Sequence, residues 1–164
     1  MLNRLEEVHQ LYDKTVPKGE EVFMVIKAHL IIESALIEFV KARTVDADEF
    51  HNQIFDGNSP CRNGLGLVLL AQGLSIRDEI PQTHAEIIWP SLKLLNSIRN
   101  RLVHELSPDH TKIRAQMRKF CDSVFPEGIW NHESDVNKAF YKSAGLLLSL
   151  LHIDRHPLWV EDTI

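Results

Sequence analysis

The sequence predicts an all-α protein, a single-domain helical bundle of about six or seven helices that covers residues 1–164. Three observations lead to this prediction. Apolar residues recur at the spacing of a helix along most of the chain, whereas strand-like alternation is hard to find. A length of 164 residues suffices for one hydrophobic core. With 44% hydrophobic and 25% charged residues, the composition is that of an ordinary globular protein.

Four helices are expected in the first half of the chain. Residues 2–14 place leucines and a valine on one stripe. Residues 20–43 form the strongest candidate, because a helix that is apolar on most faces is usually central. Residues 46–55 predict a short helix that runs into "DGNSPCRNG", the richest turn signal of the chain. Residues 65–74 follow as a buried helix.

The second half predicts three helices. The segment 83–106 is helical on both sides of Pro90, where we expect a kink or a fresh start because proline removes one backbone hydrogen bond. Residues 109–125 predict the next helix. Residues 135–153 predict the last one, with Ser134 as its candidate N-cap.

The charge balance favours some partners over others. Lys and Arg total 18 against 23 Asp and Glu, a net charge of -5. Tight binding to DNA requires a basic face, and no helix-turn-helix with a basic recognition helix is visible, so direct DNA binding is not expected. An acidic chain suits a basic protein partner better.

Several features favour a cytoplasmic protein. Cys61 and Cys121 stand far apart and form no CxxC pair, so we expect free thiols in a reducing compartment. The first residues, "MLNRLEEVHQLYDK", do not resemble a signal peptide, and no segment predicts a membrane span.

The residues with the strongest chemical potential lie in "LNSIRNRLVHEL", where Arg99 and Asn100 precede His104. At about 100° per residue, Asn100 and His104 are neighbours on one helix face, while Arg99 and His104 are about 140° apart. We therefore expect Asn100 to orient the imidazole directly. Arg99 would share a phosphate with His104 most easily from a second copy of the helix, in a homodimer.

One interpretation of these residues is catalytic. An imidazole titrates near neutrality, so His104 suits a general base or acid for attack of an RNA 2′-hydroxyl on its own phosphate. Arg99 would hold the phosphate through its guanidinium group. Such a reaction needs no metal ion.

The other interpretation is structural. Asn100 and His104 would satisfy one another, while Arg99 or Arg101 would pair with an acid of a neighbouring helix, such as Glu33 or Glu86. Buried polar groups need partners, and these contacts would organise the core.

Two resemblances bear on this choice. Arg99, Asn100 and His104 resemble the Arg-polar-x-x-x-His signature of the higher eukaryotes and prokaryotes nucleotide-binding (HEPN) superfamily of helical domains, many of which are metal-independent ribonucleases. Residues 20–110 resemble the mannitol operon repressor family of small helical bacterial proteins, through "HLIIESALIEFV", "IFDGNSP", "GLGLVLLAQGLSI" and "LNSIRNRLVHE" in that order. The second resemblance implies a regulator that acts through protein contacts.

Our first hypothesis is therefore a cytoplasmic regulatory or inhibitor protein that binds another protein, including the option of an antitoxin or immunity protein that occludes a basic toxin. Trp130 and Trp159, in a loop and near the end of the sequence, are the candidate partner-binding residues. The alternative is a dimeric, metal-independent HEPN-type endoribonuclease or toxin that acts on RNA through Arg99, Asn100 and His104.

We expect neither a metal nor another cofactor. His152 and His156 have the i,i+4 spacing of helical ligands, but Pro157 follows at once and no carboxylate or thiolate completes a ligand set. No glycine-rich phosphate loop or nucleophile elbow is present.

Overall fold

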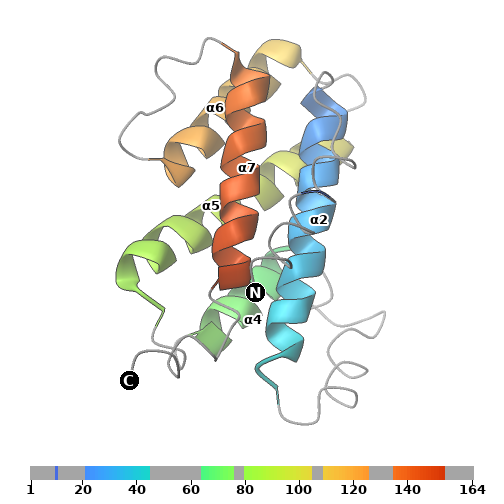
Figure 1. The fold of residues 1–164 in the computed structure, drawn as a ribbon. Coiled ribbons are helices and arrows are strands. Elements are labelled where there is room, and N and C mark those ends of the chain that lie inside the picture. The colour runs from blue at the N-terminus through green and yellow to red at the C-terminus, as the bar shows by residue number, and fades with distance from the viewer. Residues whose placement is uncertain are drawn as a thin grey trace.

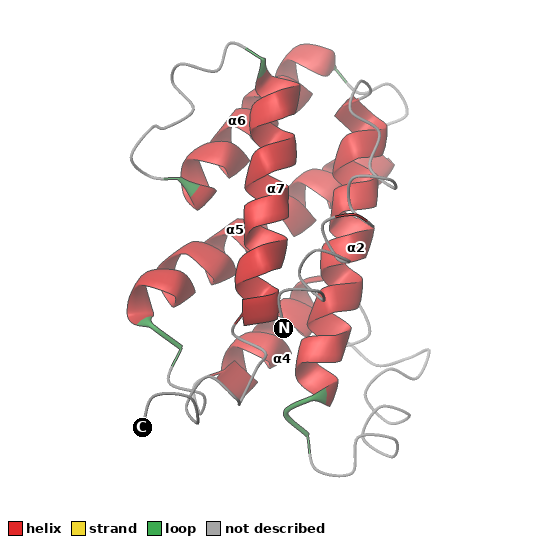
Figure 2. Ribbon diagram, viewed as in Figure 1, coloured by secondary structure: helices red, strands yellow, loops and turns green. Residues whose placement is uncertain are grey.

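The computed structural model describes residue 10 and residues 21–44, 64–75, 80–104, 109–125 and 135–153. Every regular element in these ranges is an α-helix (Figure 2), which confirms the all-α class. The described helices are α2 (Glu21–Lys41), α4 (Gly64–Ser75), α5 (Gln82–His104), α6 (His110–Val124) and α7 (Val136–Ile153). The predicted helix over residues 46–55 lies outside the described residues, and so does the one over residues 2–14 except for residue 10.

The helices pack around α2 and α5. Helices α2 and α7 lie side by side, and α5 passes behind both of them (Figure 1). Helix α6 packs against α7 and α5, while α4 packs against α2 and α5. Both α2 and α5 contact each of the other described helices, which confirms that the apolar segment at 20–43 is central.

Aromatic rings fill two parts of the core. Phe120 and Phe140 join α6 to α7, with 5.0 Å between their ring centroids. Phe39 of α2 and Trp89 of α5 pack in a T-shaped arrangement, with 6.1 Å between their ring centroids. Pro90 follows this tryptophan inside α5, which continues as one helix from Gln82 to His104. Of the two expected outcomes at Pro90, a kink or a fresh start, the fresh start is therefore wrong, while the kink stays a prediction.

Aspartates begin the last two helices. Asp109 caps α6, since its carboxylate accepts hydrogen bonds from the backbone N–H groups of Thr111 and Lys112. Asp135 does the same for α7 through Asn137 and Lys138, at 2.9 and 3.4 Å. The capping residue is thus Asp135 and not Ser134, because the carboxylate at 135 reaches these orphan N–H groups.

Cys121 is free and buried in the core. Burial raises the pKa of its thiol to about 11, so the thiol stays protonated at neutral pH. Among the described helices, none combines the length and hydrophobicity needed to cross a membrane.

Candidate functional site

The last two turns of α5 present the motif at the surface. His104 is exposed, and Arg99 and Asn100 are half-buried. Arg99 Nη1 donates a hydrogen bond to Asn100 Oδ1 at 2.9 Å. Asn100 Oδ1 is thus the acceptor for Arg99, whereas the expected contact between Asn100 and His104 stays a prediction. Adjacent helix positions do not normally face each other, but the length of the arginine lets its guanidinium reach the neighbouring amide.

The carboxylates expected to pair with Arg99 or Arg101 have other partners. Glu33 accepts a hydrogen bond from the backbone N–H of Gly64 at 3.2 Å. Glu86 accepts one from Gln82 Nε2 at 2.8 Å. Arg101 is exposed. Neither Arg99 nor Arg101 forms an ion pair with Glu33 or Glu86 in the described part of the chain, and His104 is exposed.

A buried polar contact lies further along the same interface. His29 of α2 and Asn96 of α5 are each 6% exposed, and His29 Nε2 lies 3.4 Å from Asn96 Oδ1. Asn96 precedes Arg99 by three positions and Asn100 by four, so these side chains occupy neighbouring positions on α5. We call His29, Glu33, Asn96 and Arg99 the polar seam. It leads from the core to the exposed end of α5.

The polar seam also holds the start of α4. Gly64, its first residue, has a φ of 61°, in the left-handed region that favours glycine. Its N–H is the donor to Glu33, so a carboxylate of α2 caps this helix. A Cβ at position 64 would lie 3.2 Å from Asn96 Oδ1. Three helices therefore meet closely here, and a small recess lined by His29, Glu33, Gly64, Asn96 and apolar side chains lies between them.

Electrostatics at His29 reflect this burial. Desolvation lowers the pKa of His29, Glu33 opposes the shift, and the Arg99 guanidinium adds to it. With the proton on Nε2, the ring donates to Asn96, and the buried Nδ1 has no hydrogen-bond partner within the described residues. Glu33 Oε2 lies 3.9 Å from this Nδ1. A neutral His29 therefore leaves a lone pair facing a carboxylate.

Sequence reasoning missed His29 and Asn96 as part of the site. The available signal was positional: His29 and Glu33 interrupt an apolar helix at i,i+4, and Asn96 lies one turn before Arg99. Neither spacing says which faces of the two helices meet.

The other candidate residues lie elsewhere. Trp130, Trp159 and His156 lie outside the described residues, and so does the side chain of His152. Within the described ranges, no group of three or more His, Cys, Asp or Glu side chains could hold a metal ion.

Comparison of the chain with protein-family models, curated proteins and solved structures finds no match. The resemblances to the HEPN superfamily and to the mannitol operon repressor family stay predictions.

Proposed function

We propose that the protein is a metal-independent endoribonuclease of the HEPN type that acts as a homodimer on RNA. The observation that carries this proposal is the state of the motif: His104 is exposed, and the Arg99 guanidinium is held by a neutral amide at 2.9 Å. A cation held by an amide keeps its charge for an anionic ligand, whereas a carboxylate would neutralise it.

In this proposal the reaction is an intramolecular transfer at an RNA phosphate. His104 takes the proton of a 2′-hydroxyl as its oxygen attacks the adjacent phosphorus. The bond to the 5′ oxygen breaks, and that oxygen takes a proton from water. The products are a 2′,3′-cyclic phosphate and a 5′-hydroxyl. Arg99 binds the phosphate oxygens and stabilises their developing charge, and Asn100 holds the guanidinium in place.

Helix geometry favours a site shared by two subunits, since Arg99 and His104 are about 140° apart around the axis of α5. Exposed apolar side chains on α5 and α2 also favour self-association. Val103, next to His104, is 52% exposed, and Phe23 and Leu30 of α2 are 55% and 46% exposed.

The test is cleavage of RNA in the presence of EDTA. The intact protein should cleave, and Arg99→Ala and His104→Ala should each lose at least about a hundredfold in kcat/KM. Arg101→Ala is the matched control, because this exposed cation lies about 160° away from Arg99 on the same helix. The absence of cleavage by the intact, folded protein would refute the proposal.

Mixing the two inactive variants tests whether the site is shared. A heterodimer of Arg99→Ala and His104→Ala subunits retains one site with both residues intact, so activity should return on mixing. If each site lies within one chain, the mixture stays inactive. Co-expression of the two variants ensures that subunits exchange.

A second candidate function is the regulatory or inhibitor protein, which binds another protein and cleaves nothing. The exposed apolar side chains favour it, including Leu65 and Leu69 of α4, which are 48% and 51% exposed and one turn apart. In a chain of net charge -5, such a surface suits a basic partner, including a toxin.

This second proposal predicts a stable complex that depends on the apolar side chains and not on the motif. A co-purifying basic protein should be lost from Leu65→Ser/Leu69→Ser and kept by His104→Ala. Retention of the partner by the double serine variant, with its fold intact, would refute this surface.

A further inference from the structure

The interface of α2 and α5 contains, besides Arg99, a second group that becomes cationic when it takes up a proton, the imidazole of His29. His29 is bonded to Asn96, and Arg99 follows Asn96 by one helical turn on α5. The imidazole is 6% exposed and its Nδ1 has no hydrogen-bond partner in the described part of the chain. A buried ring with a free acceptor is a site where a proton can be taken up.

Within the described residues, two charged groups act on His29. Glu33 of its own helix, with Oε2 at 3.9 Å from Nδ1, favours the protonated ring. Arg99 of α5 opposes it. Helix α4, which lies against both, has no charged side chain between Gly64 and Ser75. In the described part of the chain, Arg99 is therefore the charged group that disfavours protonation of His29, after the larger effect of burial.

We propose that a phosphate group bound at the Arg99 guanidinium is coupled to uptake of a proton by the buried His29, one helical turn away along α5 through Asn96. This inference rests on the proposed function, because RNA supplies the phosphate. His29 is a positioning residue here and does not touch the reacting atoms.

The direction of the coupling follows from charge. A phosphate anion at Arg99 cancels the repulsion that this guanidinium exerts on a protonated imidazole. Binding therefore makes protonation of His29 easier, and by linkage protonation strengthens phosphate binding by the same factor. The added proton on Nδ1 would face Glu33, whose Oε2 lies 3.9 Å away. This carboxylate stabilises the cationic ring.

The experiment follows the ring of His29 by NMR. The protein is titrated with acid alone, with inorganic phosphate, and with a 2′-O-methyl oligonucleotide, which lacks the attacking hydroxyl. The pKa of His29 should rise on saturation with either ligand. Affinity for the oligonucleotide should increase about three- to tenfold as the pH falls through this titration. In His29→Gln that part of the pH dependence should disappear.

Two variants make the result specific. Arg99→Gln should raise the pKa of His29 in the free protein and make it insensitive to phosphate. Arg101→Gln should do neither. A pKa of His29 that stays unchanged when the oligonucleotide saturates the intact protein would overturn the inference, and so would an unchanged pKa in Arg99→Gln.

The outcome also separates this inference from the proposed function. If the protein cleaves RNA but the pKa of His29 does not change when the oligonucleotide binds, the coupling is refuted and the ribonuclease function is not. A His29 that responds to phosphate in a protein that cleaves no RNA refutes the ribonuclease and keeps the coupling. Circular dichroism at each pH confirms that the compared states are folded.

Discussion

His29 and Asn96 face each other across the α2–α5 interface, with 3.4 Å between Nε2 and Oδ1. Both residues are buried, each with 6% of its surface exposed. The hydrogen bond between them compensates the free-energy cost of removing both polar groups from water. His29→Leu or Asn96→Leu alone should therefore cost about 1–3 kcal/mol of unfolding free energy, because one polar group stays buried without its partner.

The double variant His29→Leu/Asn96→Leu should recover most of this loss, since replacing both members of a buried polar pair by apolar groups is close to neutral. Urea denaturation of the four proteins measures the coupling. If the double variant loses the sum of the two single effects, the pair does not behave as one unit.

Gly64 is required by its backbone conformation, and Gly73 provides the comparison within the same helix. Gly64→Ala should destabilise the protein by about 1–2 kcal/mol, because φ is 61° and the new Cβ meets Asn96 Oδ1 at 3.2 Å. A Cβ at Gly73 meets nothing within 4 Å, so Gly73→Ala should stabilise by about 0.5–1 kcal/mol. Thermal denaturation of the two variants measures both changes in stability. Equal effects at the two positions would contradict the role assigned to Gly64.

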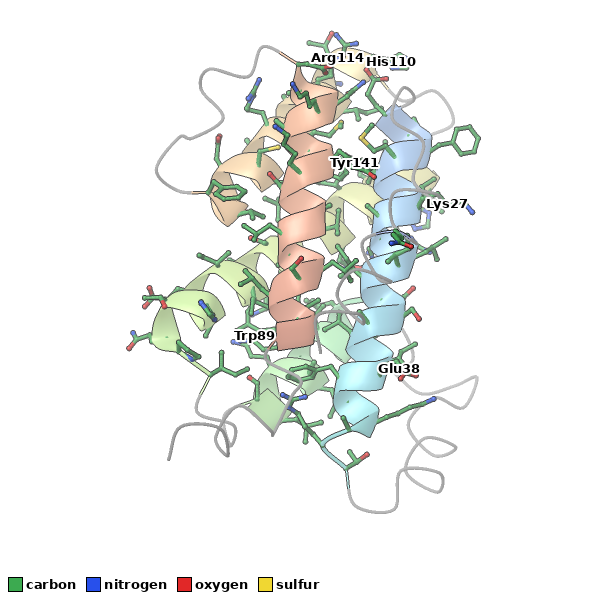
Figure 3. All side chains as sticks on the ribbon, viewed as in Figure 1. Lys27, Glu38, Trp89, His110, Arg114 and Tyr141 are labelled. Carbon is green, nitrogen blue, oxygen red and sulfur yellow. The ribbon has the colours of Figure 1, made fainter. Side chains whose placement is uncertain are left out.

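Glu21 joins the start of α2 to the start of α6, where His110 and Arg114 lie (Figure 3). Arg114 Nε donates to Glu21 Oε1 at 2.8 Å, and His110 Nδ1 lies 3.3 Å from Oε2. The bond from Arg114 lowers the pKa of Glu21. Stability from this carboxylate is thus complete above its ordinary pKa of about 4.5 and is lost as the pH falls through the lower folded value.

Glu21→Gln should cost about 1 kcal/mol at pH 7, a modest amount because Arg114 is largely exposed. Near pH 3 the variant and the parent protein should approach the same stability. Urea denaturation at the two pH values measures both effects. A difference that stays constant between them would show that the charge of Glu21 is not what stabilises the contact.

Asn100 should act through Arg99. Asn100→Ala removes the acceptor of the 2.9 Å hydrogen bond from Arg99 Nη1, so the guanidinium is held less firmly. Under the proposed ribonuclease function, KM for RNA should rise about five- to tenfold. Asn100→Asp gives the opposite test, because a carboxylate beside Arg99 would neutralise it and should weaken RNA binding further. Steady-state kinetics that leave KM unchanged in both variants would exclude this role.

The fold was more accessible to sequence reasoning than the polar seam. Helical periodicity and turn residues predicted α2, α4, α5, α6 and α7 close to their observed bounds, because these signals are local. The cap at Asp135 was misplaced by one residue, since Ser134 and Asp135 both suit that position.

The polar seam depends on contacts distant in the sequence. His29 and Asn96 are 67 positions apart, and their contact depends on the rotation of α2 against α5, which periodicity does not specify. Likewise, the bond between Arg99 and Asn100 depends on a side-chain conformation. The spacing of Arg99, Asn100 and His104 predicted their angular positions around α5. Whether these side chains are exposed could be determined only from the packed structure.

The cap that Glu33 provides for Gly64 makes α4 dependent on α2 for its first turn. Helix α4 has no charged residue of its own between Gly64 and Ser75, and its apolar residues Leu67, Val68 and Ala71 are buried in the core that it shares with its neighbours. Separation of α2 would remove the cap and expose those side chains together. The two helices should accordingly behave as one cooperative unit in hydrogen exchange, opening together although 22 residues of the chain separate Lys41 from Gly64.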